Sequence, residues 1–548
     1  MLERRWLRVL VPALLAGTAT LLMFARLGEP SRIIFDETYY VNDARDFLDR
    51  GVEEGFVVHP PLGKQLIAAG IQLVGDHPAG WRSAGALAGL VTVLLTYLIG
   101  RRLFRSMVPA ALASLLLMID GAFLVQARTA MLDIFLAMFV TLGAWLLLLD
   151  RDHVRAADDA VLANADPTRE RLRLPRPHRG FLLLAGVSFG LAIATKWSGG
   201  LGLVAGALMV IIWEVGRRHR ITGSWWRHPW RAVGLLLLGF VVVPVAAYAI
   251  TWSPWYANFP DSHEGGKVCK ESEECSASLT AKAAAFGRFH QGMAKFHLGL
   301  EADHPYRAPA YSWPVQARPV VYYYETCSED RFNRVPSEND DGETEVPDPC
   351  RVERGRAGEI IALGNPALWW SFLAATSLLI AGALRRDRRS SLPLVFYLVQ
   401  FLPWLIVSRP AFSFYTVPFI PFLALGVGAA AAHLLDRRPS GWVWGTASVG
   451  AVVGLVGVFL ADLLVGDYTR PTYGIGIGLC WVAGAATGEW IGRRQVDLQL
   501  RNGGLGRWAV AVAATAAVLL AIFFLPVWLG IPMDEHVVRQ RWWFRGWI

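Results

Sequence analysis

Apolar segments, most of them about 20 residues long, recur along almost the whole chain, and this is the length that an α-helix needs to cross a bilayer. Short polar segments rich in arginine separate them. The pattern predicts about thirteen transmembrane helices, at 7–27, 81–100, 106–126, 130–149, 181–195, 199–215, 232–252, 359–384, 391–408, 412–435, 442–465, 473–492 and 508–530. Two of the short pairs also fit re-entrant segments. The predicted fold class is an all-α polytopic membrane protein.

Arginine clusters predict how the chain crosses the membrane. Three arginines precede the first apolar segment, and seven lie in 150–180. Because cytosolic loops carry an excess of Arg and Lys, we expect a cytosolic N-terminus and an extracytoplasmic C-terminus. A cleaved signal peptide is the alternative for the first segment. The long polar segments 28–80 and 253–358 then lie outside, and 38–50 has the pattern of a helix in the membrane interface.

Composition supports the membrane assignment. Hydrophobic residues make up 54% of the chain and charged residues only 18%, which is not typical of a soluble domain. The formal net charge of +8 is concentrated in short loops and is read as an orientation signal. No nucleic-acid partner is therefore expected.

Four of the five cysteines fall in the long segment 253–358, namely Cys269, Cys275, Cys327 and Cys350. Clustered cysteines in a polar loop favour two disulfides in an oxidising compartment, which agrees with an extracytoplasmic location. Metal binding is the alternative, but the spacing lacks the paired Cys-x-x-Cys knuckles of a zinc site.

Polar residues that interrupt the apolar segments converge on the predicted outer side. They are Asp36, Glu37, His59, Lys64, Arg128, Asp133, Lys196, His304 and Arg409. Charges at membrane depth are costly and usually mark a functional cavity, although each one taken alone also fits a structural pair or a snorkelling side chain.

The adjacent carboxylates suit a general base that removes a proton from a hydroxyl group, with the second acid raising the basicity of the first. The cations suit a phosphate carried by a lipid, whose charge they neutralise as it leaves. A sugar donor on a polyprenyl phosphate meets both requirements.

Two aromatic motifs fit the wall of such a cavity. His304-Pro305-Tyr306, followed by Ser312-Trp313-Pro314, could line a carbohydrate or acceptor site. Tyr415 lies in an aromatic run after Arg409, at the outer end of a predicted helix. An aromatic belt at the membrane interface is the alternative for both.

Taken in order, the motifs resemble the protein O-mannosyltransferase family, the polyprenyl-phosphate-mannose-dependent glycosyltransferases of the GT-C fold. Phe35–Tyr40 resembles the family's Asp-Glu motif in the first outer loop, and His59–Lys64 its His-Pro-Pro-Leu-Gly-Lys motif. Further matches are Arg128 with Leu132-Asp133, Thr195–Gly199, His304–Tyr306 with Ser312–Pro314, Gly364–Pro366 and Arg409–Pro421. The ending, Arg541–Ile548, resembles the bacterial, actinobacterial branch.

The resemblance implies an inverting transfer of mannose from polyprenyl phosphate mannose to Ser or Thr hydroxyls of exported polypeptides. It implies a single GT-C domain over 1–548 in the bacterial plasma membrane, with the active site on the extracytoplasmic face and the secretion translocon as an associated partner. Asp36 is then the expected base, with Glu37 assisting or contacting the acceptor. The expected donor-binding residues are His59, Lys64, Arg128, Asp133, Lys196 and Arg409, and the residues lining the acceptor or sugar are Tyr40, His304, Tyr306, Trp313 and Tyr415.

Two departures from the family pattern stand out. Family members usually have eleven spans, so the range becomes 11–13 helices, with one pair overcounted. The segment 253–358 is too short and too interrupted for the β-trefoil MIR domain that eukaryotic members carry in this loop.

Other functions remain open at this stage. A related GT-C transferase would modify a cell-wall glycan or lipid, and a lipid or solute transporter would place broken helices at the bilayer midplane. Asp36 and Glu37 are also hard oxygen ligands for a divalent metal, but no further carboxylates complete a cage. Apart from the lipid-linked donor, which is a substrate, no cofactor is predicted.

Overall fold

The structure is a computed structural model of the chain, and it describes residues 5–547 apart from 165–173, 226–228, 270–276, 302–303, 329–332, 334–336, 339–343, 346–349, 408 and 436–502. Within these residues, eight helices are long and apolar enough to cross a membrane, and a bent pair of helices adds a ninth. The predicted helical, multi-pass architecture is confirmed. The helices predicted at 442–465 and 473–492 lie outside the described residues.

The first half of the chain forms a series of helices that mostly follow the predicted apolar segments. They are α1 (Leu7–Phe24), α2 (Glu37–Arg50), α3 (Leu62–Val74), α4 (Pro78–Phe104), α5 (Met107–Met118), α6 (Gly121–Ala127), α7 (Asp133–Ala163), α8 (Gly180–Thr195), α9 (Gly199–Thr222), α10 (Pro229–Leu237) and α11 (Val243–Thr251), with a π-helical turn at Leu238–Val242 between the last two. The interface helix predicted at 38–50 is α2.

The second half adds short helices and strands before returning to long helices. It contains α12 (Ser253–Ala257), α13 (His263–Cys269), α14 (Leu279–Gly299), β1 (Val320–Thr326), β2 (Ser337–Glu338), β3 (Thr344–Glu345), β4 (Arg356–Ala362), α16 (Pro366–Leu384), α17 (Arg388–Phe401), α18 (Ile420–Leu434), α21 (Gly503–Leu529), β5 (Met533–Asp534) and α22 (Glu535–Arg539). Short 3-10 turns lie at Phe259–Asp261, Ala310–Val315, Leu402–Leu405, Ser413–Phe419 and Arg545–Trp547.

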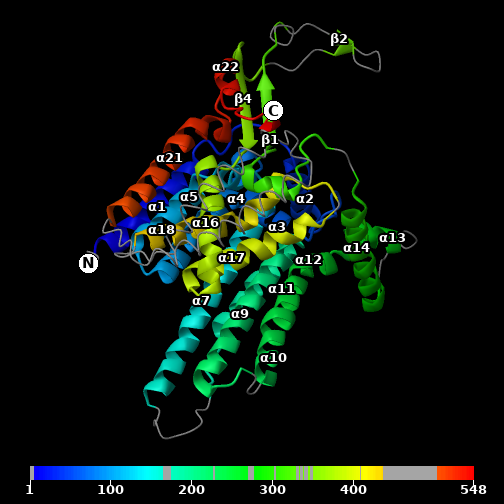
Figure 1. The fold of residues 1–548 in the computed structure, drawn as a ribbon. Helices are drawn as coiled ribbons and strands as arrows, with labels where there is room; N and C mark the ends of the chain where they lie inside the picture. Colours follow the sequence, from blue (N-terminus) through cyan, green and yellow to red (C-terminus); the bar gives the residue numbers. More distant parts are fainter. Residues whose placement is uncertain are drawn as a thin grey trace.

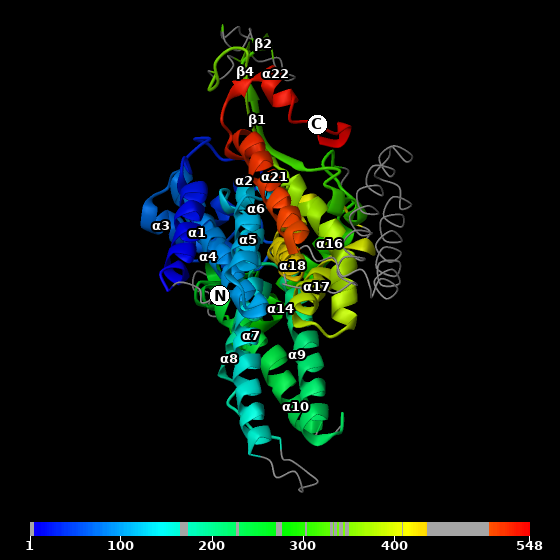
Figure 2. The same cartoon turned by 60° about the vertical axis from the view of Figure 1, so that its left-hand side comes forward.

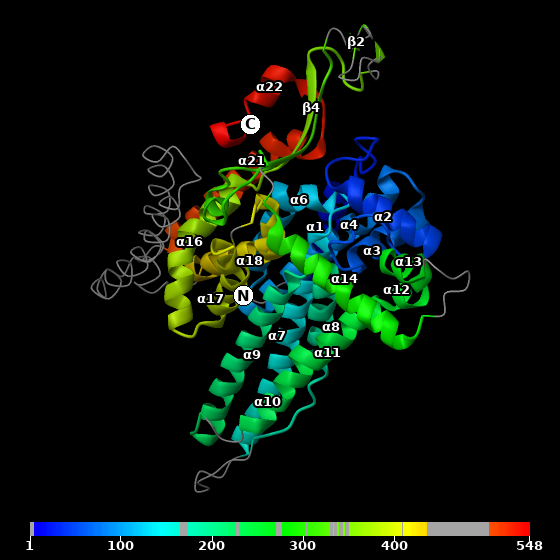
Figure 3. The same ribbon diagram turned by 90° about the vertical axis from the view of Figure 1, so that its right-hand side faces the viewer.

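The molecule has two distinct ends. Helices α7, α8, α9 and α10 extend as a bundle from one end, and β1, β4 and α22 lie at the other (Figures 1 and 2). Figure 3 shows α12, α13 and α14 beside α2 and α3, and the rings of Phe296 and Phe56 lie 6.0 Å apart across that contact. This contact brings α14 to the first polar loop.

The core lies along the spans that other helices surround. The span at Ser413–Leu434 is 89% buried in the protein and α7 is 78% buried, whereas α1 is only 17% buried. An outward apolar helix such as α1 is stable because lipid covers its exposed face. Asp133 begins one of these buried helices, α7, and Tyr415 lies in the span at Ser413–Leu434.

The prediction of one continuous helix at 106–126 is wrong, because the segment breaks into α5 and α6 with a bend of 64°. The cause is Asp120, whose side chain accepts the Phe123 N–H and so caps α6. Its other oxygen accepts N–H groups from Asn365 and Trp369, at 2.8 and 2.9 Å. A polar residue in the apolar segment thus starts a new helix.

The segment 181–195 forms α8, with 16 residues, as predicted, whereas two further predicted helices need correction. The segment 391–408 forms α17, which has 14 residues and continues as a 3-10 turn. Both α8 and α17 are shorter than the eight spans. The helix predicted at 359–384 begins only at Pro366, since 356–362 is strand β4.

The all-α prediction therefore misses a small antiparallel sheet in the order β1-β4-β5. Val320 pairs with Ala362, and Thr326 pairs with Ala357 at the other end of the β1–β4 ladder. Asn365 then caps α16 through the Ala367 N–H. The sheet joins the large loop to the residues that follow α21.

One disulfide of the large loop joins Cys327 to Cys350, with Cα atoms 5.5 Å apart. Cys269, at the end of α13, is also disulfide-bonded. Cys275, the remaining cysteine of the predicted pairs, lies outside the described residues.

Candidate active site

Asp36 lies at the start of α2, on a loop that bends sharply just before it. Phe35 has a φ of +48°, a left-handed conformation that costs a residue with a side chain about 1–2 kcal/mol. Its ring stacks on Tyr322 at 4.2 Å and meets Phe414 edge-on at 5.8 Å, which holds the bend in place. The bend turns the Asp36 carboxyl away from the end of α2, and the carboxyl makes no capping bond there.

The Asp36 carboxyl is half-buried, and within the described residues it makes no side-chain hydrogen bond or ion pair. Burial raises its pKa to about 6, and the negative charge of Asp133 adds to this, while Lys196 opposes it. A carboxyl with a pKa near 6 is ionised at neutral pH and holds a proton more readily than an ordinary aspartate. These are the properties of a general base.

Glu37, the next residue, has a different environment. It is fully buried and receives two parallel bonds from Arg82, at 2.7 and 2.9 Å. It also accepts the backbone N–H groups of Ile34 and Ala130, at 3.0 and 3.1 Å. These four bonds make Glu37 an anchor that ties the Asp36 loop to α4 and to the hairpin before α7.

Lys196 and Asp133 form an ion pair whose two charges both act on Asp36. The Lys196 Nζ lies 3.0 and 2.9 Å from the two Asp133 oxygens. It also lies 4.7 Å from the centre of the Tyr415 ring, a cation–π contact. Asp133 begins α7 and Lys196 follows α8, so two packed helices fix this pair.

Arg409 is the second cation of the site. It donates from Nη2 to the Tyr415 hydroxyl at 3.0 Å and from Nη1 to Nδ1 of His297 at 2.8 Å. Because a guanidinium can only donate, Nδ1 of His297 accepts and Nε2–H donates to the Val58 carbonyl, at 2.8 Å. His297 is therefore neutral, and burial together with the charge of Arg409 lowers its pKa.

His59 lies directly against this bridge. Its ring stacks on His297 with centroids 5.1 Å apart. Burial, with the positive charges of Lys196, Lys64 and Arg409, lowers the pKa of His59 well below its usual range. A neutral imidazole here can serve as a polar wall or hydrogen-bond partner for a sugar.

Lys64 and Arg128 lie in polar clusters of their own. Lys64 is fully buried between Asp43, at 3.0 Å, and Glu53, and also donates to the Phe56 carbonyl. Arg128 donates to three carbonyls at the end of α1, those of Leu22, Met23 and Arg26. Of Lys64, Arg128 and Arg409, the structure thus brings only Arg409 into contact with Tyr415, which also lies against Lys196.

Aromatic side chains surround the cluster in two layers. Tyr40 and Tyr322 are buried, and the charges of Asp36 and Asp133 act on both hydroxyls. Gln126 donates to the Tyr322 hydroxyl at 2.6 Å, which orients it. Tyr415 completes this inner layer.

Trp313, His304 and Tyr306 belong to the outer layer. Trp313 lies behind Tyr415, with ring centres 6.4 Å apart, and donates to the Ala308 carbonyl. The His304 ring contacts Phe412, and Tyr306 lies on Arg318. The structure does not bring these three residues to Asp36.

The space beside Lys196 is small in this conformation. A cavity of about 10 Å³ is lined by Asp133, Lys196, Ser198, Leu201, Gln400, Trp404, Tyr415, Pro418 and Phe419. This is no larger than the space of one water molecule. Side chains must therefore move before a sugar phosphate can enter.

Among the described residues, no three His, Cys, Asp or Glu side chains are grouped so that they could hold an ion. Asp133 is already paired with Lys196, and Glu37 with Arg82. The described donor set fits an organic phosphate better than a metal.

Three contributors were not found from the sequence. Of the three, Arg82 carries the clearest signal in the sequence, because it is a charge inside the apolar segment 81–100. Tyr322 lies in the run Val320–Tyr324, which is typical of a strand. His297 carries no motif, and only its position on α14 brings it to the site.

Known proteins resemble this chain along most of its length. The model of the dolichyl-phosphate-mannose-protein mannosyltransferase family matches residues 13–85 and 79–255, and that of the C-terminal four-span region of protein O-mannosyltransferases matches 283–474. The polyprenol-phosphate-mannose–protein mannosyltransferase of Mycolicibacterium smegmatis is 31% identical over 81% of this chain and 86% of its own. That of Mycobacterium tuberculosis is 33% identical over 80% and 83%.

The fold agrees with these matches. The structure of the S. cerevisiae protein O-mannosyltransferase Pmt1-Pmt2 complex bound to the sugar donor superimposes with a TM-score of 0.67, at 13% identity, over 100% of this chain and 93% of that one. The predicted GT-C fold is therefore confirmed. From the family matches and the relatives together, the chain belongs to the protein O-mannosyltransferase family.

Proposed function

We propose that this protein transfers mannose from polyprenol phosphate mannose to Ser or Thr hydroxyls of exported polypeptides, with Asp36 as the general base. The names of the mycobacterial relatives supply the reaction. The observation that carries the role of Asp36 is its free, half-buried carboxyl with a pKa of about 6, next to the Lys196–Asp133 pair.

In this mechanism, Asp36 accepts the proton of the acceptor hydroxyl. The hydroxyl oxygen forms a bond to the anomeric carbon of mannose, and the bond from that carbon to the phosphate oxygen breaks. The electron pair leaves with the polyprenyl phosphate. Attack from the face opposite the leaving group inverts the anomeric centre.

Lys196 and Arg409 are the cations we assign to the leaving phosphate, which gains negative charge as the bond breaks. Both are oriented before substrate binds, Lys196 by Asp133 and Arg409 by Tyr415 and His297. Lys64 and Arg128 are bound to other groups in this conformation. For them, contact with the donor requires a rearrangement of their clusters.

We place the site on the extracytoplasmic face of the bacterial plasma membrane. The arginine-rich ends of α7 and α9 then lie in the cytosol, as the positive-inside rule requires. The Cys327–Cys350 disulfide fits the oxidising side. Acceptor polypeptides would reach this face unfolded, as they leave the secretion translocon.

The test is mannose transfer in membranes supplied with polyprenyl phosphate mannose and a Ser/Thr-rich peptide. Wild type is compared with Asp36→Asn at matched expression, with Asp49→Asn as control, because Asp49 is an exposed acid on the same helix. Loss of transfer with retained donor binding in Asp36→Asn alone supports the proposal.

Two other results would change it. Full activity in Asp36→Asn removes Asp36 from the chemistry. Wild-type membranes that mannosylate a glycan or lipid but no peptide point to a GT-C transferase with a cell-wall acceptor.

A further inference from the structure

A large cavity lies at the far end of the bundle formed by α7, α8 and α9. Its volume is about 720 Å³, and its walls come from the end of α7, from α9, from Arg179 before α8 and from the turn between α16 and α17. Asp150 in this wall follows Asp133 by seventeen residues on one continuous helix, which corresponds to about 25 Å. The cavity therefore lies about one bilayer thickness from the catalytic cluster.

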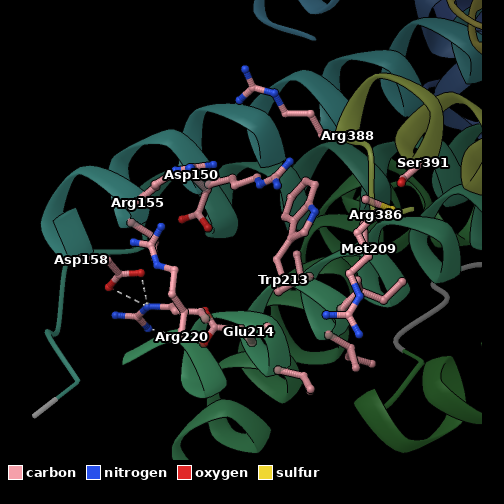
Figure 4. A pocket seen from close by; sticks show the side chains of 18 of the residues that line it. Asp150, Arg155, Asp158, Met209, Trp213, Glu214, Arg220, Arg386, Arg388 and Ser391 are labelled. Atoms are coloured by element: carbon pink, nitrogen blue, oxygen red, sulfur yellow. Dashed lines mark hydrogen bonds and ion pairs between the residues drawn. The ribbon is translucent and has the colours of Figure 1, made fainter. Parts of the chain in front are cut away.

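The wall is strongly basic. It contains seven arginines but only three acids: Arg151, Arg155, Arg179, Arg217, Arg220, Arg386 and Arg388 against Asp150, Asp158 and Glu214 (Figure 4). All three acids are occupied by ion pairs. Arg179 bridges Asp150 and Glu214, both at 2.7 Å, and Arg217 binds Asp158 at 2.9 Å.

Arg155 and Arg220 share Asp159, at 3.9 and 2.8 Å, and the other three cations lack such compensation. Within the described residues, Arg151, Arg386 and Arg388 have no carboxylate within ion-pair distance. Arg151 lies over the Trp213 ring at 4.6 Å and Arg386 over the Trp225 ring at 5.8 Å. These contacts orient the guanidinium groups and leave their N–H groups able to donate to a ligand. Arg155 and Arg388 add their positive charges at Arg151. Such a cluster attracts a phosphate group.

The rest of the wall is apolar. Met209, Val210, Ile211 and Ile212 contribute from α9, and Val395 from α17. Ile211 and Ile212 are 42% and 50% exposed although they lie on a helix that spans the membrane. In a bilayer these side chains face lipid, so the apolar wall continues into the hydrocarbon region. Its occupant must combine a phosphate with acyl chains.

We propose that this cavity binds an anionic phospholipid of the membrane leaflet opposite the active site. The phosphate lies between Arg151 and Arg388, whose charges act on each other, and one acyl chain follows the apolar face of α9. Because α7 begins at Asp133 and α9 begins at Gly199, three residues after Lys196, the bound lipid holds the far ends of two helices whose near ends adjoin the catalytic ion pair.

The test uses the purified full-length protein, delipidated in detergent and titrated with dioleoylphosphatidylglycerol by native mass spectrometry. We expect one saturable lipid, bound about tenfold or more tightly by wild type than by the double variant Arg151→Gln/Arg388→Gln, because two charge-assisted contacts are lost. Arg102→Gln is the matched control, since Arg102 pairs with Asp152 outside the cavity wall. It should bind as wild type does, and Arg151→Lys/Arg388→Lys should retain most of the affinity.

Several results would overturn the proposal. These are equal affinity in the double Gln variant, equal binding of dioleoylphosphatidylcholine, full competition by inorganic phosphate, or a preference for a polyprenyl phosphate. A diazirine-labelled phosphatidylglycerol applied to wild type needs no variant to fold. Crosslinks in 205–220 and 383–395 support the site, and crosslinks confined to other segments reject it.

Discussion

Two clusters, one around Lys64 and one around Lys196, each combine one lysine with two carboxylates, with opposite results. Around Lys64, both Asp43 and Glu53 contact the ammonium group, and the whole cluster is closed to solvent. Around Lys196, Asp133 takes the ammonium group and Asp36 remains without a partner among the described residues. The first cluster holds the fold together, and the second keeps one carboxylate free for chemistry.

The pKa values separate the clusters further. Burial raises the pKa of Glu53 to about 7, against the pull of Lys64, because two acids share one buried cation. Burial raises the pKa of Asp36 to about 6 for the same reason. Glu53 is buried and its proton has no path to a substrate, whereas Asp36 is partly exposed. Access, more than basicity, distinguishes the catalytic acid.

The strongest test of this contrast replaces one acid in each cluster, Asp36 beside Lys196 and Asp43 beside Lys64. We expect Asp36→Asn to lower the rate of mannose transfer by about 10²–10⁴, the usual contribution of a general base, with little change in thermal stability. Asp43→Asn should lower stability first, because it removes a partner of buried Lys64. Transfer rates and melting curves of both variants in detergent measure this. Equal stability losses in the two variants would remove the distinction.

The lysines should separate in the same way. Lys64→Met leaves two buried carboxylates without a cation, and we expect it to cost about 3–5 kcal/mol of stability. Lys196→Met should instead lower the rate by about 10²–10³, as expected for loss of a group that stabilises developing charge. Unfolding by denaturant gives the first value and donor-saturated rates the second. A folded, fully active Lys196→Met protein would contradict the role assigned to Lys196.

Substitution of His297 should have a smaller effect, because His297 only orients Arg409. His297→Phe removes the acceptor for Arg409 and the link to Val58, and we expect about a tenfold loss in kcat/KM for the donor. His297→Asn, which can still accept and donate, should recover part of it. If both variants lose only stability, His297 is structural.

The smallest expected effect is a shift with pH. The Asp36 carboxylate is the active form and its pKa is raised, so activity should be full above about pH 7 and fall as pH drops through about 6. Glu53 has the opposite consequence for stability: its contribution is present below about pH 4.5 and lost as pH rises through about 7. Lys196→Gln should move the activity midpoint upward, since Lys196 lowers the pKa of Asp36. A profile that stays flat to pH 5 would argue against Asp36 as the base.

Sequence patterns predicted the elements that carry the site, but not every contact within it. Asp36, Asp133, Lys196 and Arg409 were found because charges in apolar sequence stand out and belong to family motifs. The different fate of Glu37 was not predictable, since its partner Arg82 lies 45 residues away in the chain. Adjacent identical charges look equivalent until their surroundings are known.

The errors in the fold have similar physical causes. Strand β4 was merged with α16 because Glu359–Leu363 is as apolar as a helix start, and only Asn365-Pro366 marks the boundary. The break at Asp120 is not predictable, because a single acid in an apolar segment does not indicate which groups its side chain will bind. Asp120 Oδ2 accepts N–H groups from Asn365 and Trp369, in the second half of the chain, which periodicity cannot show.

Asp120 also determines how the protein can be divided. It receives N–H groups from Asn365 and Trp369, and Asn365 in turn donates to the carbonyls of Ile119 and Ala517. A fragment that ends before α16 would present this carboxylate to lipid without those donors. If the two halves are produced as separate polypeptides, their reassembly should therefore depend on Asn365. Co-purification of the complementary fragments then becomes an assay for this buried hydrogen-bond network.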